Sequence, residues 1–342
     1  MTDVLIRIDG VAGRITLNRP QALNALTWEM LLAIEAALDA WRDDPAVKLV
    51  IIDAAGDKAF CAGGDIAQMY ATGKAGDFAY GQRFWRDEYR LNRKIYHYAK
   101  PVVSFLQGFT MGGGVGVGCH GSHRIVGETA QIAMPEVTIG LVPDVGGSLI
   151  LAQAPGHVGE YLGTTGARIA ASDAIYASFA DVFVPEDAWQ VLKVQLCESG
   201  DVGVIAGFTT SAPPGTLPAL RAEIDAVFGA ADVFAALQAA ETELATGAAK
   251  KIGRNAPLAL RVTIDLIRAV RKDPTIETAL DHEFRYTFRA AEYGDFIEGI
   301  RAAIIDRDRT PRWRHADVAA VPAADVAQMT AELGADALHW EE

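Results

Sequence analysis

The apolar and polar positions in the first half of the chain alternate between strand and helix periods. Residues 4–18, VLIRIDGVAGRITLN, alternate around a Gly-containing turn and predict a β-hairpin. From Thr27, a candidate N-cap, to Arg42 the apolar residues recur at helical spacing. The same patterns predict a buried strand at 47–56, a loop leading into a helix at 57–70, and a long helix at 78–98. They also predict a strand at 102–108 and a short strand at 123–128. This alternation is typical of an α/β layered or spiral architecture.

From about residue 186 the strand signals disappear and alanine dominates. SAPPGTLP at 211–218 reads as a connector, and residues 255–303 predict two or three helices. One helical face there is expected to carry Ile276, Leu280, Phe284, Phe288 and Ala291. The last 30 residues are expected to be helical or loosely packed. We therefore predict a core at 1–185, a helical connector at 186–250 and a C-terminal helical region at 251–342.

Charge and cysteine content narrow the function classes. The 342 residues carry a formal net charge of −13, which argues against binding to nucleic acid or to an anionic membrane. An anionic small ligand would need backbone N–H groups and a few local basic residues. The three cysteines, Cys61, Cys119 and Cys197, are too widely spaced for a disulfide framework or a metal site. With no visible signal peptide or membrane-length apolar run, a cytoplasmic protein is expected.

Two glycine-rich stretches could bring backbone N–H groups to a ligand. FCAGGD at 60–65 lies between a predicted strand and a predicted helix, where exposed N–H groups and the helix dipole favour negative charge. An ordinary strand-to-helix turn is the alternative. MGGGVGVG at 111–118 lacks the Lys-Ser/Thr of a phosphate loop and fits the dinucleotide pattern poorly. It holds its backbone close either to a ligand or to another helix.

A third stretch, MPEVTIGLVPDVGG at 134–147, places Glu136 and Asp144 in apolar surroundings. A carboxyl group there has a raised pKa and can act as a base or a nucleophile. Solvated loop acids, or an acid capping a turn, are the alternatives. Together the three stretches suggest an oxyanion hole built from two glycine turns, with nearby carboxylates moving protons or attacking. No metal is expected, because no histidine shows metal-ligand spacing: His97, His120, His123 and His157.

The motifs LNRPQALNAL, FCAGGDI, MGGGVGV and MPEVTIGLVPDVGG, in this order, resemble the crotonase (enoyl-CoA hydratase/isomerase) superfamily over about residues 4–185. FWRDEYRLN at 84–92 and DFIEGIRAAIIDRDRTPRW at 295–313 are similar to its 3-hydroxyisobutyryl-CoA hydrolase branch. The resemblance implies a spiral of β-β-α turns followed by a helical C-terminal region. It also implies acyl-CoA thioester chemistry in valine breakdown, with CoA as part of the substrate and no separate cofactor. Crotonases often form trimers or hexamers, while hydrolase-branch members pack the tail on their own core.

The resemblance also assigns roles by position. Gly64 and Gly113 correspond to the residues whose N–H groups form the oxyanion hole. Glu136 corresponds to the catalytic carboxylate, Asp144 to its partner, and Glu88 to a residue near the acyl group. The residues expected to line the path of CoA are Leu23, Ala62 and Ile66. Arg307 and Arg312 in the tail either meet CoA phosphates or belong to a solvated basic face.

One departure from the family pattern separates the candidate reactions. Hydratases with two glutamates carry one two positions after the triple glycine, in the form GGGCE, where this chain has Gly116. They carry a small residue where this chain has Asp144. Thioester hydrolysis is therefore the expected reaction, with enoyl-CoA hydration or isomerisation as the alternative and a non-catalytic CoA-binding protein as a third. SLILAQAPG follows PDVGG in place of the branch's aromatic and Pro-Arg-Leu run, so the acyl group stays open.

Overall fold

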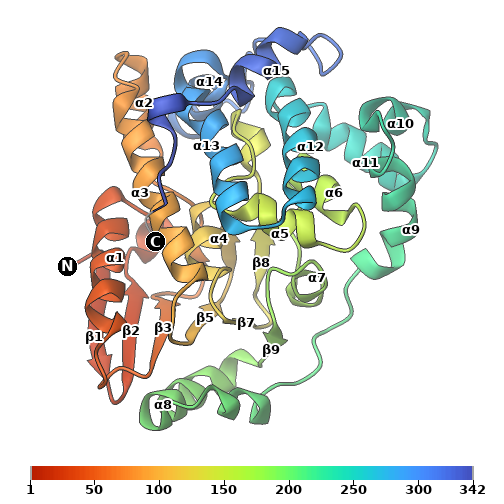
Figure 1. Ribbon diagram of the computed structural model, residues 1–342. Helices are drawn as coiled ribbons and strands as arrows, with labels where there is room; N and C mark the ends of the chain where they lie inside the picture. Colours follow the sequence, from red (N-terminus) through yellow and green to blue (C-terminus); the bar gives the residue numbers. More distant parts are fainter. Residues whose placement is uncertain (1, 341–342) are drawn as a thin grey trace. The chain divides into compact units, whose positions relative to one another are not determined.

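The computed structural model, drawn in Figure 1, describes residues 2–340. These residues divide into two compact units that each combine several stretches of chain. We call them the sheet unit, residues up to Gly64 with Arg90–Ala133 and Arg168–Gly215, and the helical unit, Asp65–Tyr89 with Met134–Ala167 and Thr216 onward. Each unit is described by itself. The domain boundaries expected at 185 and 250 stay a prediction.

A six-stranded sheet organises the sheet unit in the order β1-β2-β3-β5-β7-β9. Its strands are β1 Val4–Asp9, β2 Ala12–Leu17, β3 Leu49–Ala54, β5 Val102–Leu106, β7 His123–Val126 and β9 Val182–Phe183. The predicted hairpin is confirmed, because β1 and β2 pair antiparallel with Val4 opposite Leu17. All other neighbours pair in parallel. The expected α/β alternation is thus confirmed in this unit.

A second sheet of three short parallel strands, in the order β4-β6-β8, was not predicted. It comprises β4 Ala59–Cys61, β6 Phe109–Met111 and β8 Gln131–Ala133. A three-residue strand is too short to show alternation, and glycine follows two of these strands directly or within two residues. The sequence therefore suggested loops where the chain makes a further layer of pairing.

The helices of the sheet unit include α1 Trp28–Arg42, α4 Gly113–Gly118, α7 Ala171–Tyr176 and α8 Trp189–Ser199. Thr27 caps α1 as predicted, since its side chain accepts a hydrogen bond from the Met30 N–H group. A buried cluster joins residues of β3, β5 and β7 to the apolar face of α8, where the Trp189 indole donates to the Val184 carbonyl. The core of this unit thus lies between its large sheet and its helices.

The helical unit contains α2 Ala67–Lys74, α5 Gly147–Gln153, α6 Val158–Thr165, α9 Leu217–Phe228, α10 Val233–Ala239, α11 Glu243–Ile252, α12 Pro257–Lys272, α13 Ile276–Tyr293, α14 Phe296–Ile300 and α15 Ala323–Thr330. Helix α3, Ala79–Tyr96, begins in this unit and ends in the sheet unit. Short 3-10 helices cover Pro20–Ala22, Glu136–Ile139, Glu186–Ala188, Val202–Gly207 and Gly334–Asp336, and a π-helix covers Arg301–Ile305. Within residues 2–340, no helix is long and apolar enough to cross a bilayer.

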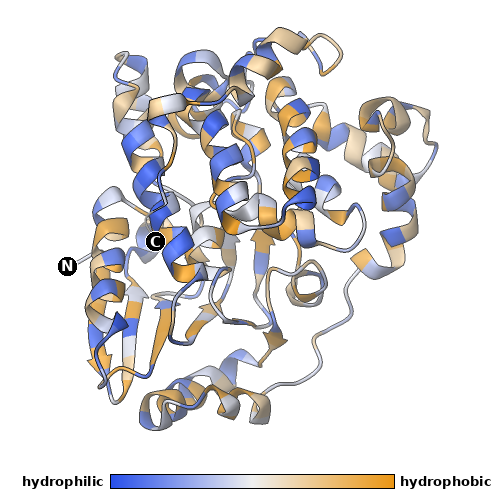
Figure 2. Ribbon diagram, in the orientation of Figure 1, coloured by the Kyte–Doolittle hydropathy of each residue, from blue (hydrophilic) through white to orange (hydrophobic). Residues whose placement is uncertain are grey.

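The helices predicted at 255–303 are confirmed as α12, α13 and α14. Figure 2 shows blue and orange alternating along α12, the pattern of an amphipathic helix, and its apolar side packs against α5 and α6. On α13, Ile276, Leu280 and Phe284 are buried as expected. Phe288 and Ala291 are only half-buried. The buried face of α13 also carries polar residues that an apolar stripe does not predict.

Candidate functional site

In the sheet unit, the two predicted glycine loops leave the same end of adjacent parallel strands. Cys61 of β4 is the register partner of Thr110 of β6, and Gly64 and Gly113 each follow these partners by three residues. The loops approach so closely that a side-chain carbon on Gly114 would stand 2.3 Å from the Cys61 carbonyl oxygen. Gly113 is the first residue of α4, so its N–H group has no acceptor within the helix. Glycine is thus required here by close backbone approach.

Leu23 and Ala62 also lie together in the sheet unit. The Ala62 N–H group donates to the Leu23 carbonyl at 3.0 Å, and Leu23 and Asn24 both adopt left-handed backbone angles. The buried Asn24 amide holds this turn by donating to the carbonyls of Ala55 and Ala59. Ile66, the remaining residue predicted to meet CoA, belongs to the helical unit and immediately precedes α2.

Four buried carboxyl groups gather in the helical unit: those of Glu88 on α3, Glu136, Asp144 and Glu283 on α13. Their exposed fractions are 3%, 5%, 4% and 0%. The alternative of solvated loop acids is therefore wrong for Glu136 and Asp144. Removal from water favours the neutral form of each acid, and repulsion from neighbouring carboxylates adds to this for Glu88, Glu136 and Glu283. The pKa of Asp144 rises to about 7 and that of Glu283 to about 8, while those of Glu88 and Glu136 rise well above the usual value.

Two of these acids have oxygen atoms without a hydrogen-bond partner. Among residues 2–340, no group pairs with Glu88 Oε1 or with Glu136 Oε2, and both atoms are shielded from solvent. A buried polar atom left unpaired costs about 1–3 kcal/mol. Such atoms are rare in folded proteins and mark places where a ligand, a water or a reaction accounts for them.

Asp144, in contrast, is held by named partners. The buried Tyr89 hydroxyl donates to Asp144 Oδ2 at 2.9 Å and lies 3.3 Å from Thr287 Oγ1 of α13. This bond stabilises the ionised form and so partly offsets the rise that burial causes in the pKa of Asp144. Burial and the nearby carboxylates raise the pKa of Tyr89, so its hydroxyl stays a donor.

The backbone directly after Asp144 is strained. Val145 has φ 55° and Gly146 has φ 76°, so two successive residues are left-handed. For a β-branched residue this conformation is an outlier that costs about 1–3 kcal/mol. Glu283 binds this turn, because its carboxyl oxygens accept hydrogen bonds from the N–H groups of Gly146 and Ser148 and from the Ser148 hydroxyl.

Sequence reasoning missed Tyr89, Glu283 and Asn92. Glu283 lies at helical spacing from Ile276 and Leu280, so a carboxyl group within that apolar stripe was the available signal. Asn92 follows Glu88 by one helical turn on α3 and is fully buried. Neither of its amide atoms has a partner in the described part of the chain. Nothing in the local pattern distinguishes Tyr89 or Asn92 from ordinary residues of a half-buried helix.

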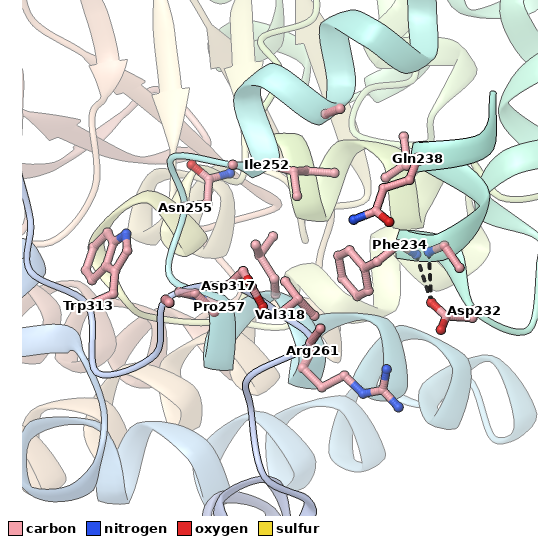
Figure 3. Close-up of a pocket in the computed structure, with 17 residues that line it drawn as sticks. Asp232, Phe234, Gln238, Ile252, Asn255, Pro257, Arg261, Trp313, Asp317 and Val318 are labelled. Carbon is pink, nitrogen blue, oxygen red and sulfur yellow. Dashed lines mark hydrogen bonds between the residues drawn. The ribbon is translucent and has the colours of Figure 1, made fainter. Parts of the chain in front are cut away.

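The remaining predicted groups lie elsewhere. The Arg307 side chain donates to the Ile304 carbonyl of the π-helix, and the backbone N–H group of Arg312 donates to Glu298 of α14. A cavity of about 370 Å³ in the helical unit lies between α10–α12 and the tail residues near Trp313 (Figure 3). It contains none of the predicted site residues. Within residues 2–340 there is no group of three or more His, Cys, Asp or Glu side chains that could hold a metal ion.

A family model described as enoyl-CoA hydratase/isomerase matches residues 12–330. The chain belongs to this family. This crotonase is 38% identical to the mitochondrial 3-hydroxyisobutyryl-CoA hydrolase of Rattus norvegicus, over 97% of this chain and 89% of that protein. It is 35% identical to the protein of that name from Homo sapiens, over 99% of this chain and 91% of that protein. The resemblance to the hydrolase branch is thereby confirmed.

Solved structures confirm the crotonase fold. A structure described as an enoyl-CoA hydratase from Rhodobacter sphaeroides 2.4.1 has a TM-score of 0.96 and 55% identity, over 99% of this chain and 100% of that chain. A structure described as a carnitinyl-CoA dehydratase from Mycobacterium thermoresistibile has a TM-score of 0.93 and 40% identity, over 97% of both chains. The crotonase fold is thus established, while the names of the relatives point to more than one reaction.

The buried acids predict that stability falls as pH rises. Asp144 and Glu283 keep their protons in the folded state up to about pH 7 and 8, whereas the unfolded chain releases them near pH 4. Between these values the free energy of unfolding should drop by about 1.4 kcal/mol per pH unit for each extra proton bound by the folded state. Urea unfolding at pH 5, 6 and 7 measures this slope.

Asp144→Asn is expected to make this slope shallower, because Asn has no proton to release in this pH range. Asn is nearly the size of Asp, so the packing of the site should change little. The difference between wild type and variant cancels titrating groups that Asp144 does not affect, including the two histidines whose pKa is lowered by burial, His123 and His282. Asp265→Asn, on the exposed side of α12, is the matched control and should leave the slope unchanged. Equal slopes in wild type and Asp144→Asn would show that Asp144 does not keep its proton in the folded state up to about pH 7.

Proposed function

We propose that this protein hydrolyses an acyl-CoA thioester, with 3-hydroxyisobutyryl-CoA as its substrate. The observation that carries the proposal is the pair of buried acids, Glu136 and Asp144, in a chain with Gly116 at the position of the first hydratase glutamate. The mitochondrial relatives from rat and human are named as 3-hydroxyisobutyryl-CoA hydrolases. This chain matches 89% and 91% of their length. The proposed reaction is the hydrolase step of valine breakdown.

Gly64 and Gly113 donate their N–H groups to the thioester oxygen in this proposal. Their loops leave adjacent parallel strands in the same register, which supports a shared role. Each such donor contributes roughly 3–4 kcal/mol to stabilising the charge that develops on the oxygen. Glu136 follows β8 by three residues, as Gly64 follows β4 by three and Gly113 follows β6 by two. Along the chain, each of the three groups therefore comes two or three residues after a strand of the small sheet.

Glu136 supplies the attack on the thioester carbon in its ionised form, while its neighbour Asp144 holds the proton. It either attacks directly and forms an anhydride, or removes a proton from a water that attacks. Its unpartnered Oε2 supports both routes, since no protein bond has to break first. Asp144 donates its proton to the CoA thiolate as the carbon–sulfur bond breaks. Overall, one water is consumed, and the products are a carboxylic acid and free CoA.

The remaining groups bind substrate in the proposal. Glu88 accepts a hydrogen bond from the substrate 3-hydroxyl through its unpartnered oxygen, Oε1. Leu23, Ala62 and Ile66 line the path of CoA, and Arg307 and Arg312 are candidates for its phosphates. The reaction requires no metal and no cofactor besides the CoA carried by the substrate. A cytoplasmic location and assembly into trimers or hexamers stay predictions, and the named curated relatives are mitochondrial.

Hydration of an enoyl-CoA is the second candidate, because the Rhodobacter sphaeroides relative carries that name. Adding water across a double bond by the two-glutamate route needs a carboxylate where this chain has Gly116, a buried residue of α4. The test compares two assays on one preparation: thiol release from 3-hydroxyisobutyryl-CoA, and loss of enoyl absorbance with crotonyl-CoA. We expect thiol release alone. Loss of enoyl absorbance without free CoA would overturn the proposal, and inactivity in both assays would favour a CoA-binding protein.

Glu136→Gln is expected to lower kcat for thiol release by about 100- to 10,000-fold. The amide cannot act as a base or a nucleophile, and general-base groups typically contribute factors of this size. The variant keeps the shape of the side chain, so the KM for the acyl-CoA should change little. Glu292→Gln, at an exposed position of α13, serves as the control. A variant with full activity would rule out Glu136 as the attacking group.

Tyr89→Phe is expected to shift the pH profile of kcat/KM. Asp144 acts in its protonated form, so activity should fall as pH rises through its pKa of about 7. Loss of the Tyr89 hydroxyl removes a bond that lowers this pKa, and the falling limb should move to higher pH. Phenylalanine keeps the ring contact with Phe284, and Tyr293→Phe at an exposed site is the control. An unmoved limb would show that Tyr89 does not act on Asp144.

A further inference from the structure

Helix α13 reaches Asp144 in two ways within the helical unit. Glu283 and Thr287 lie one turn apart on its buried face, and both are fully buried. Glu283 binds the backbone that directly follows Asp144. Thr287 lies against the hydroxyl of Tyr89, which donates to the Asp144 carboxylate. One helix face therefore contacts both the backbone turn and the side-chain partner of Asp144.

The turn after Asp144 depends on outside support. Val145 and Gly146 are both left-handed, and a β-branched residue adopts this conformation only where its surroundings impose it. Glu283 Oε2 accepts from the Gly146 N–H group at 2.8 Å, and Oε1 accepts from the Ser148 N–H group at 3.0 Å. The Ser148 hydroxyl is a third donor to Oε1. Three bonds to one buried carboxyl group fix the turn to α13.

We propose that Glu283 is a positioning residue, which holds the turn Val145–Ser148 and thereby sets the place of the Asp144 carboxyl group. The inference rests on the proposed hydrolase function, in which Asp144 protonates the departing thiolate. Glu283 itself has all its bonds inside the protein and touches no substrate in this scheme. A displacement of about 1 Å in a reacting group can lower a rate about 100-fold, so the anchor matters for turnover.

Glutamine is the informative replacement for Glu283 because the two side chains have the same size. Its single carbonyl oxygen can accept on one side of the turn, while its NH₂ group would face an N–H donor on the other. We expect Glu283→Gln to lower kcat for thiol release about 10- to 100-fold. The KM should change by less than about threefold, because substrate contacts stay in place. Glu292→Gln on the same helix should leave both constants unchanged.

Ser148→Ala provides a milder variant that removes only the hydroxyl donor. It should lower kcat less than Glu283→Gln does. The double variant should be no slower than Glu283→Gln alone, because the two residues act through one turn. Losses that multiply in the double variant would overturn a shared role. Thermal unfolding checks that each variant is folded, and Ser148→Ala carries the test if Glu283→Gln does not fold.

A readout without substrate tests the anchor separately. Amide hydrogen exchange in the segment 144–150 should speed up about tenfold or more in Glu283→Gln, and should not change in Glu292→Gln. If wild type releases no CoA, the proposed function fails, and exchange alone decides whether Glu283 holds the turn. If wild type is active and Glu283→Gln retains both its kcat and its slow exchange, the positioning role is overturned.

Discussion

Keeping four carboxyl groups out of water is the constraint on which the chemistry of this protein depends. Each buried acid loses hydration, which favours its neutral form and raises its pKa. The four acids differ in how many hydrogen bonds they accept. Glu283 receives three donors and Asp144 receives one from Tyr89, whereas Glu88 and Glu136 each keep an oxygen without a partner among residues 2–340. Glu283 and Asp144 are held in place by these bonds, whereas the unpartnered oxygens of Glu88 and Glu136 can each accept a hydrogen bond from a ligand.

The candidate site groups of the sheet unit are backbone N–H groups, whereas those of the helical unit are side-chain carboxyl groups. Short parallel strands carry Gly64 and Gly113 to one sheet end, and the loops approach so closely that Gly114 cannot be replaced without a collision with Cys61. A backbone N–H group cannot titrate, and it points in a direction fixed by the fold. In the proposed reaction, stabilisation of the thioester oxygen by these two groups would therefore stay constant over the pH range in which Asp144 gains or loses its proton.

The predictability of each feature follows from the range of the interactions that make it. The hairpin at 4–18 and the cap at Thr27 arise from neighbours in sequence, and both were predicted. The three-residue strands were not predicted, because their stability comes from pairing between distant segments. Glu136 and Asp144 stood out as acids in an apolar run. Glu283 acts on a turn about 137 residues earlier in the chain, and only the folded chain reveals this.

The names of the relatives divide between cutting a thioester and adding water to a double bond, and the acids separate these reactions. Thioester hydrolysis releases a thiolate, and a free thiol has a pKa of about 8.5. In the proposed reaction Asp144, with a pKa of about 7, would give its proton to that more basic thiolate in a favourable step. Hydration by two glutamates uses a carboxylate at the position of Gly116, where the backbone of α4 offers none. Asp144 thus suits the thiolate leaving group of thioester hydrolysis. The glutamate that hydration requires is the one that this chain replaces with Gly116.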